Sequence, residues 1–265
     1  MSLLLAVDVG NTYVVLGIFD LTKGPDGPLV CSWRLATSRE RTIDEYGLST
    51  LALMRHHGIE AGQIKHVAIS CVVPPLHPVL MGLAKTYFDV DAFYVEPGVK
   101  TGVKVLIDNP AELGADRLVN AVAGIEMFGA PLIVVDFGTA TTFDVISAEG
   151  DYVGGVISPG INLSAEALHK SAAMLPRVAV TRTQSIIGKD TVPAMQSGLY
   201  WGYIALIEGL VIRIKAEFGA PMTVIATGGL GRVFYRQTPV IDHYDPDLTI
   251  RGLVQIFARN SVKAD

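Results

Sequence analysis

The sequence predicts an α/β protein of two similar halves, each built on a mixed five-stranded β-sheet with helices. Half of the 265 residues are hydrophobic and only 18% are charged, so the chain can bury a substantial core. An Asp-x-Gly turn follows a short apolar run twice, at residues 8–12 and again at residues 136–140. The order of predicted elements, β-β-β-α-β-α-β-α, also occurs twice. We therefore predict two domains, residues 1–129 and 130–265.

In the first half, each predicted strand is a short apolar run bounded by turn residues. These runs are residues 3–7, 14–19, 29–35, 65–73 and 92–95. The Gly- and Pro-rich residues 23–28 predict a loop. Helices are predicted at residues 43–57, 79–88 and 109–128. Thr42 and Glu45 have the spacing of a capping box, and Asn109 followed by Pro110 suits the start of the third helix.

The second half repeats this order with one addition. Its predicted strands are residues 132–136, 142–147, 152–157, 222–226 and a short one near Val240. Its predicted helices are residues 162–174, a short one after Gly231, and residues 249–259. The addition is a long helix at about residues 191–218, with Gly198 and Gly202 among apolar side chains. A surplus of apolar surface favours a helix that pairs two protomers over a pure core helix.

Composition and spacing argue against several classes of function. A net charge of −5 disfavours a nucleic-acid-binding surface. Cys31 and Cys71 lie in apolar runs, which is typical of reduced core thiols in a cytosolic protein. Residues 3–7 are too short for a signal segment, and residues 199–214 are short for a membrane span. We therefore expect a soluble, cytoplasmic protein with no membrane or nucleic-acid partner.

The two Asp-x-Gly turns are the candidate phosphate sites. Such a tight turn lets backbone N–H groups approach an anion, and neighbouring hydroxyls add further donors. The carboxylate cannot itself attract a phosphate, so we expect it to hold a cation that does. Two such turns facing one another would bind a polyphosphate. The sequence contains no P-loop, and its six histidines do not have zinc-site spacing.

Several motifs resemble a known family. The turns at Asp8 and Asp136, together with Thr227-Gly228-Gly229, resemble the acetate and sugar kinase/Hsp70/actin superfamily. Residues 114–117, Gly-Ala-Asp-Arg, and residues 154–160 resemble the type III pantothenate kinases over essentially the whole chain. The resemblance implies two ribonuclease H-like (actin-like ATPase) domains with a nucleotide cleft between them. It also implies transfer of the ATP γ-phosphoryl group to the 4′-hydroxyl of pantothenate, the first step of coenzyme A biosynthesis.

The resemblance further implies Mg²⁺ with ATP, a monovalent cation (K⁺ or NH₄⁺) and a homodimer. It assigns Asp116 as the catalytic proton acceptor and Asp136 as the ligand of the monovalent cation. The nucleotide-binding residues that it implies are Asp8, Val9, Gly10, Asn11, Thr12, Tyr13, Val14, Val15 and Thr139. The substrate-binding residues that it implies are Gly114, Ala115, Asp116, Arg117 and Thr191. Many relatives have a tyrosine at the position of Ile107, so the pantothenate pocket is expected to differ there.

Each candidate also has a purely structural explanation. The turn at Asp8 could be an ordinary Asx-type turn, and Asp116 with Arg117 could be an exposed charge pair. Thr191 could be a helix N-cap, and Gly228 could simply permit a turn instead of admitting a nucleoside. At the level of function, the alternatives are a non-catalytic regulator on the same scaffold and a kinase of the same superfamily acting on a sugar or a carboxylic acid.

Overall fold

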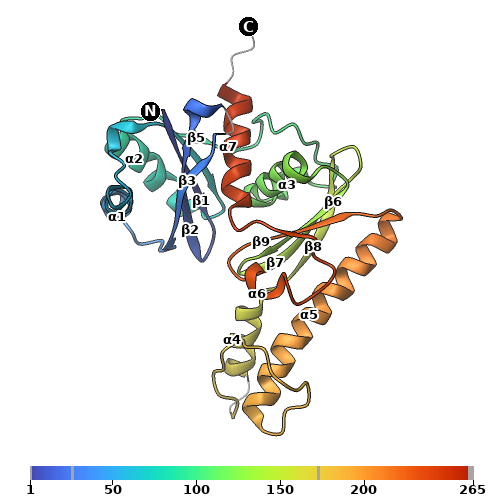
Figure 1. Ribbon diagram of the computed structural model, residues 1–265. Coiled ribbons are helices and arrows are strands. Elements are labelled where there is room, and N and C mark those ends of the chain that lie inside the picture. The colour runs from blue at the N-terminus through green and yellow to red at the C-terminus, as the bar shows by residue number, and fades with distance from the viewer. Residues whose placement is uncertain (1, 25–26, 172–173, 262–265) are drawn as a thin grey trace. The chain divides into compact units, whose positions relative to one another are not determined.

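The computed structural model describes residues 2–24, 27–171 and 174–261. The chain forms two compact units, one of residues 1–127 together with 247–265 and one of residues 128–246. Each unit contains one five-stranded sheet with helices, which confirms the predicted α/β class (Figure 1).

The first sheet has the strand order β3-β2-β1-β4-β5. Its strands are β1 (Leu3–Val9), β2 (Tyr13–Asp20), β3 (Leu29–Ala36), β4 (Ile64–Cys71) and β5 (Phe93–Tyr94). The first three strands are antiparallel, whereas β4 is parallel to β1 and β5 is parallel to β4. Leu3 to Val7 of β1 are apolar and buried because helices cover both faces of this sheet.

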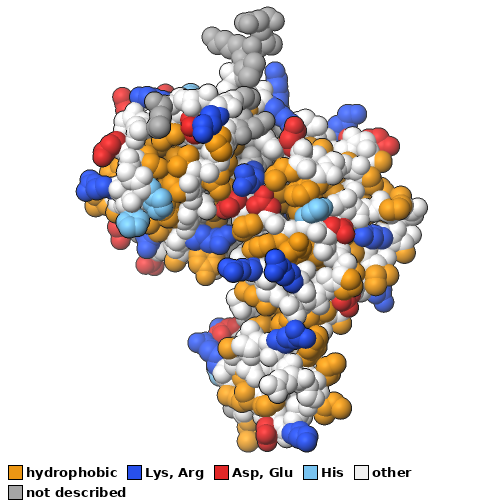
Figure 2. Space-filling view, viewed as in Figure 1, with side chains coloured by type: hydrophobic (Ala, Val, Ile, Leu, Met, Phe, Trp, Pro, Cys, Tyr) orange, Lys and Arg blue, Asp and Glu red, His pale blue; other side chains and the backbone are white. Residues whose placement is uncertain are grey.

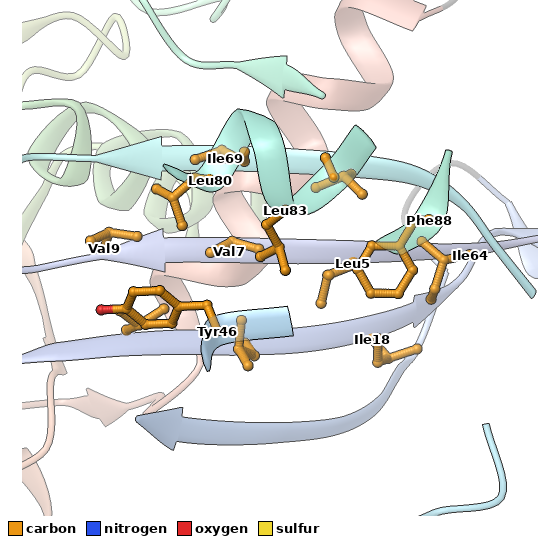
Figure 3. Close-up of a cluster of buried hydrophobic side chains, with 14 of the residues drawn as sticks. Leu5, Val7, Val9, Ile18, Tyr46, Ile64, Ile69, Leu80, Leu83 and Phe88 are labelled. Carbon is orange, nitrogen blue, oxygen red and sulfur yellow. The ribbon is translucent and has the colours of Figure 1, made fainter. Parts of the chain in front are cut away.

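Four helices belong to this sheet. Their bounds are α1 (Ile43–His56), α2 (His77–Phe88), α3 (Ala115–Phe128) and α7 (Leu248–Ser261). Side chains of α1 and α2 pack on the face that presents Leu5, Val7 and Val9 (Figure 3). Side chains of α3 and α7 pack on the opposite face, against Leu4 and Ala6. Single turns of 3₁₀ helix occur at Leu21–Lys23, Ala61–Gln63, Pro74–Leu76 and Pro110–Glu112.

The second sheet repeats the topology of the first, with the order β10-β9-β6-β7-β8. Its strands are β6 (Leu132–Phe137), β7 (Ala140–Ile146), β8 (Tyr152–Pro159), β9 (Thr223–Thr227) and β10 (His243–Tyr244). Its helices are α4 (Ile161–Ser171), α5 (Thr191–Phe218) and α6 (Gly231–Phe234). Buried side chains of α5, including Tyr203 and Ile207, pack against Ile133 and Val135 of β6.

Four predicted elements differ from the structure, and one of them, the helix predicted at residues 109–128, is described with the candidate site below. The short strand expected near Val240 lies at His243–Tyr244 instead. The helix expected at residues 162–174 is described only to Ser171, and residues 172–173 lie outside the described residues, as do residues 25–26 of the predicted loop. The last helix, which the prediction placed in domain 130–265, belongs to the first unit. The physical reason is that its apolar face, with Ile250 and Leu253, is buried with Leu4 and Ala6.

The long helix α5 is the one described helix whose length and composition would also suit a membrane span. Only 33% of the most apolar 18-residue stretch of this helix is buried. The buried part belongs to the core of the second unit, so α5 combines a core face with an exposed apolar face. Both cysteines are free, in agreement with the predicted reduced thiols.

Candidate functional site

The first Asp-x-Gly turn joins β1 to β2 and is held from outside by Thr37. The Gly10 N–H donates to the carbonyl of Tyr13 at 3.0 Å, which closes the turn. The Thr37 hydroxyl donates to the Gly10 carbonyl at 2.7 Å, and the Thr37 N–H donates to the Thr12 carbonyl at 2.9 Å. The carbonyls of Gly10, Thr12 and Tyr13 thus accept hydrogen bonds within the chain, while the side chains of Asn11 and Thr12 are exposed.

The predicted nucleotide-binding residues of this turn differ in what they can present to a ligand. The side chain of Val9 is buried in the core shared with α1 and α2 (Figure 3), and that of Val14 is buried in the same core. Only the backbone of these two residues can therefore reach a ligand. Tyr13 is 52% exposed, and Val15 packs on the opposite face of the sheet. A Cβ added to Gly10 would lie 3.5 Å from the Tyr13 carbonyl oxygen, an ordinary contact. Packing within the chain therefore does not explain a glycine at position 10.

The second turn, between β6 and β7, is braced by glycines on neighbouring segments. The Gly138 N–H donates to the Ala140 carbonyl at 3.0 Å, and the Gly160 N–H donates to the Thr139 carbonyl at 3.1 Å. A Cβ on Gly160 would lie 2.4 Å from that same Thr139 oxygen, so only glycine permits this approach. The side chain of Thr139 is exposed.

Asp136 lies against the Thr-Gly-Gly segment of the same unit. Gly228 has a φ of +85°, and a Cβ there would lie 2.5 Å from Oδ1 of Asp136. Gly228 is therefore required both by its backbone conformation and by the position of the carboxylate. A carboxylate beside backbone carbonyls suits a hard monovalent cation. Among the described residues no group of three or more His, Cys, Asp or Glu could hold a metal ion.

The helix that carries Asp116 begins later than predicted. Residues Pro110–Glu112 form a single 3₁₀ turn, and Leu113 is extended with φ −70° and ψ 118°. Asn109 makes no side-chain capping bond; its Nδ2 donates to Oε1 of Glu112 at 2.8 Å. The extended Leu113 prevents the turn from continuing, so α3 starts at Ala115. Asp116 thus lies in the first helical turn, where exposed backbone N–H groups favour a negative charge.

The Asp116 carboxylate is partly buried and lies against Gly114 and Arg117, its neighbours on the chain. Its Oδ1 accepts the Arg117 N–H at 2.8 Å. A Cβ on Gly114 would lie 2.5 Å from this oxygen, which explains the glycine of the Gly-Ala-Asp-Arg motif. Burial raises the pKa of Asp116, and the Arg117 N–H and guanidinium oppose that rise. The alternative of an exposed charge pair is therefore wrong.

The substrate motif and the first turn lie close together within the first unit. Val72, which follows β4, donates its N–H to the Val9 carbonyl at 3.0 Å. The same residue has its Cγ1 3.9 Å from the ideal Cβ position of Gly114. Strand alternation places Asp8 on the same face as Ala6, the face that packs against α3. Asp8 and the helix that carries Asp116 therefore lie on the same side of the first sheet.

Thr191, Thr139 and Asp136 belong to the second unit. Thr191 is the first residue of α5 and is exposed. The N-cap position is held by Asp190, with φ −134° and ψ 165°, and its carbonyl accepts the Ala194 N–H at 2.9 Å. The alternative of Thr191 as an N-cap is therefore wrong, and its side chain is exposed at the start of the helix.

Solved structures of other proteins have the same fold. A Campylobacter jejuni protein named as a conserved Baf family transcriptional activator has a similar structure, with a TM-score of 0.61 at 20% identity, over 97% of this chain and 98% of its own. An activator of 2-hydroxyisocaproyl-CoA dehydratase from Clostridium difficile, solved with bound ADPNP, has a TM-score of 0.52 at 12% identity, over 97% of this chain and 94% of its own. These likenesses show the fold.

Sequence relatives are much closer. A type III pantothenate kinase of Paramagnetospirillum magneticum is 52% identical over 260 residues, which is 98% of this chain and 98% of the relative. One from Bacillus cytotoxicus is 48% identical over 260 residues, which is 98% of this chain and 97% of the relative. The family model described as type III pantothenate kinase matches residues 4–213. This chain belongs to the type III pantothenate kinase family.

Proposed function

We propose that this protein transfers the γ-phosphoryl group of ATP to the 4′-hydroxyl of pantothenate. Membership of the family supports the reaction. The observation that carries the assignment to residues is the partly buried Asp116 at the start of α3, beside the segment that follows β4. An alcohol bound at that helix start would meet a carboxylate whose pKa burial has raised. That is the environment in which an aspartate acts as a general base.

The phosphates of ATP are proposed to bind at the two Asp-x-Gly turns. The exposed Asn11 and Thr12, which follow Gly10, supply donors in the first unit. Thr139 supplies a hydroxyl in the second unit, on a turn that Gly160 holds in place. The side chains of Val9 and Val14 are excluded from this role by their burial, so these residues contribute through their backbone.

In the proposed reaction, the 4′-oxygen of pantothenate attacks the γ-phosphorus as the bond to the β–γ bridging oxygen breaks. Asp116 accepts the hydroxyl proton, and ADP leaves. Gly114 leaves room for the Asp116 carboxylate, and Ala115 and Arg117, which flank Asp116 at the helix start, would contact pantothenate. Mg²⁺ bound with ATP would supply charge neutralisation at the phosphates. Asp8 in the first unit would hold it, and Asp136 would hold K⁺ or NH₄⁺.

We also propose a cytoplasmic homodimer that pairs through α5 and draws Thr191 into pantothenate binding. The exposed apolar face of α5 supports the dimer, because a monomer would leave this surface in water. Both alternative functions are less favoured. The acidic groups that the reaction needs are all present, which opposes a non-catalytic regulator, and the Gly-Ala-Asp-Arg motif opposes a sugar or acid kinase.

A coupled assay of ADP release tests the proposal. The purified protein is given MgATP with pantothenate, and separately with a panel of sugars and short carboxylic acids, each with and without K⁺. We expect pantothenate to be the only compound of this set that is phosphorylated, and we expect K⁺ to increase the rate. Turnover with a sugar or an acid at a higher kcat/KM than with pantothenate would overturn the assignment.

The variant Gly10→Ala separates the phosphate role from folding. The added methyl group makes only an ordinary contact, so the thermal midpoint should stay within about 2 °C of the unsubstituted protein. It would nevertheless occupy the surface that a phosphate must approach, and the KM for ATP should rise about tenfold or more. An unchanged KM for ATP would remove this turn from the nucleotide site.

A further inference from the structure

Two buried hydroxyls have no hydrogen-bond partner among the described residues, those of Ser70 and Thr227. Ser70 is 0% exposed and Thr227 is 1% exposed. A buried hydroxyl without a partner is costly, and native proteins contain few of them. The other buried serines and threonines all make a bond: Thr50 to Tyr46, Thr101 to Val103, Thr141 to Tyr203, Ser147 to Glu149, Ser197 to Ile186 and Thr238 to Glu208.

The two hydroxyls occupy equivalent places in the two units. Ser70 lies on β4 in parallel register with Asp8 of β1. Thr227 lies on β9 in parallel register with Asp136 of β6. In both sheets the pair joins the central strand to the first parallel strand beside it. Side chains in register on neighbouring strands project to the same face, so each hydroxyl lies beside the carboxylate of its turn.

We propose that Ser70 and Thr227 are positioning residues that hold the two turn carboxylates for the ligand. When Mg·ATP is bound, each hydroxyl donates to the carboxylate in register with it and leaves the other carboxylate oxygen for the cation or its water. The donor then has an acceptor, and the carboxylate has one orientation. Residues that hydrogen-bond to the ligands of a cation commonly orient those ligands. This inference rests on the proposed nucleotide role of the turns.

The same pairing of a hydroxyl with a carboxylate occurs in both units, which favours this role over a chance result of packing. Ser70 and Thr227 are different residue types in strands with little sequence likeness, and residues 67–73 are otherwise mostly apolar. An apolar residue would fill either place without the cost of an unpaired donor. A hydroxyl at both equivalent positions therefore serves the one feature that both positions share, the neighbouring carboxylate.

The test compares Ser70→Ala and Thr227→Val with the unsubstituted protein, using calorimetric titration with MgATP and thermal unfolding without ligand. Losing a hydrogen bond to a charged group should weaken MgATP binding about 10- to 100-fold. The unfolding midpoint of the free protein should stay equal or rise, because an unpaired buried hydroxyl has been removed. Thr227→Ser keeps the hydroxyl and should bind MgATP within about threefold of the unsubstituted protein.

Thr50→Val is the matched control in the first unit. Its hydroxyl is equally buried but already donates to the Tyr46 carbonyl at 2.7 Å. This variant should have a lower unfolding midpoint and unchanged MgATP affinity, the opposite pattern to Ser70→Ala.

The inference is overturned if Ser70→Ala and Thr227→Val bind MgATP within twofold of the unsubstituted protein. It is also overturned if both variants lose stability in parallel with affinity, since the hydroxyls would then be structural. If the unsubstituted protein binds MgATP but turns over no pantothenate, the proposed function fails and the affinities still decide the inference. If it binds no MgATP at all, both fail.

Discussion

Two opposing effects act on the pKa of the Asp116 carboxylate. Burial raises its pKa, while the Arg117 N–H and guanidinium lower it. The net rise means that the folded protein binds a proton at this group more tightly than the unfolded chain does. Above the folded-state pKa the ionised group therefore costs stability, and this cost disappears as the pH falls through that value. A base that destabilises the fold is typical of a catalytic position.

The variant Asp116→Asn tests both consequences. We expect kcat to fall about 10²- to 10⁴-fold, the usual range for removing a general base, with the affinity for ATP kept. The unfolding midpoint at pH 7 should be equal to or higher than that of the unsubstituted protein, because a buried charge has been removed. In the unsubstituted protein, kcat/KM should fall as the pH drops through the raised pKa.

Asp108→Asn is a suitable control, because this carboxylate is exposed and lies in the same segment of the chain. Its kinetics should match those of the unsubstituted protein. Activity of Asp116→Asn within threefold of the unsubstituted protein would remove Asp116 from the mechanism.

Gly114→Ala tests whether that carboxylate must stay where it is. The added Cβ would lie 2.5 Å from Oδ1 of Asp116, so the carboxylate must turn away. We expect kcat to fall about tenfold or more while the KM for ATP changes less than threefold. Gly62→Ala, where the new Cβ meets nothing within 4 Å, is the matched control and should leave the kinetics unchanged. A Gly114→Ala enzyme with normal kcat would show that the carboxylate tolerates displacement.

At the scale of single elements, α5 has apolar side chains both in the core and on the surface. Its inner side chains, such as Tyr200 and Ile207, are buried, while Ile212 is 59% exposed. A shallow apolar groove of about 440 Å³ lies between α5 and β8 and is lined by Ile157, Leu206 and Leu210, among others. Further hydrophobic side chains are exposed over the α4 and α5 end of the second unit (Figure 2). This surface is the basis for the proposed dimer.

Ile212→Glu should separate the protomers. A charge placed in a buried apolar interface typically costs about 2 kcal/mol or more, equivalent to a rise of about 30-fold in the dimer dissociation constant. Sedimentation velocity across a concentration series measures that constant. Glu217→Lys changes charge on the same helix about 140° away by helix geometry and should leave the dimer intact. A monomeric unsubstituted protein would refute the proposed dimer, and a dimeric Ile212→Glu variant would place its interface elsewhere.

At the scale of the whole molecule, the end of the chain completes the fold of its beginning. Helix α7 buries Ile250 and Leu253 with the first sheet, and Gly252 brings it against the backbone of α3. Asn260 exchanges hydrogen bonds with both backbone groups of Lys100, at 3.0 and 2.9 Å. The helix that carries Asp116 is therefore supported by residues more than 130 positions later in the sequence.

Two helical glycines should respond to alanine with opposite signs. A Cβ on Gly252 would lie 2.1 Å from the backbone carbonyl oxygen of Val119, which cannot move aside without shifting α3. We expect Gly252→Ala to lower the free energy of unfolding by about 1–3 kcal/mol, the usual cost of overpacking. A Cβ on Gly198 of α5 meets nothing within 4 Å, so Gly198→Ala should raise the free energy of unfolding by up to about 1 kcal/mol. Chemical denaturation measures both, and equal effects would contradict the close α3–α7 contact.

The sequence by itself determined the features that depend on neighbouring residues. The apolar runs predicted the strands of both sheets, and the repeated element order predicted their shared topology. The capping box of α1 is present, with the Thr42 N–H bonded to Glu45 Oε2 at 2.8 Å and the Glu45 N–H bonded to Thr42 Oγ1 at 3.3 Å. Hydrophobic period, turn residues and caps act over a few positions, so they can be recognised in the sequence.

Only the tertiary structure decided the features that depend on contacts between distant segments. These include the placement of α7 on the first sheet, the later start of α3, and the register that sets Ser70 beside Asp8 and Thr227 beside Asp136. Ser70 was not predicted as a functional residue, because the one feature that distinguishes it in the sequence is a hydroxyl in a largely apolar strand. Register and packing are set by the balance of burial across the whole sheet, and no short stretch of residues contains that balance.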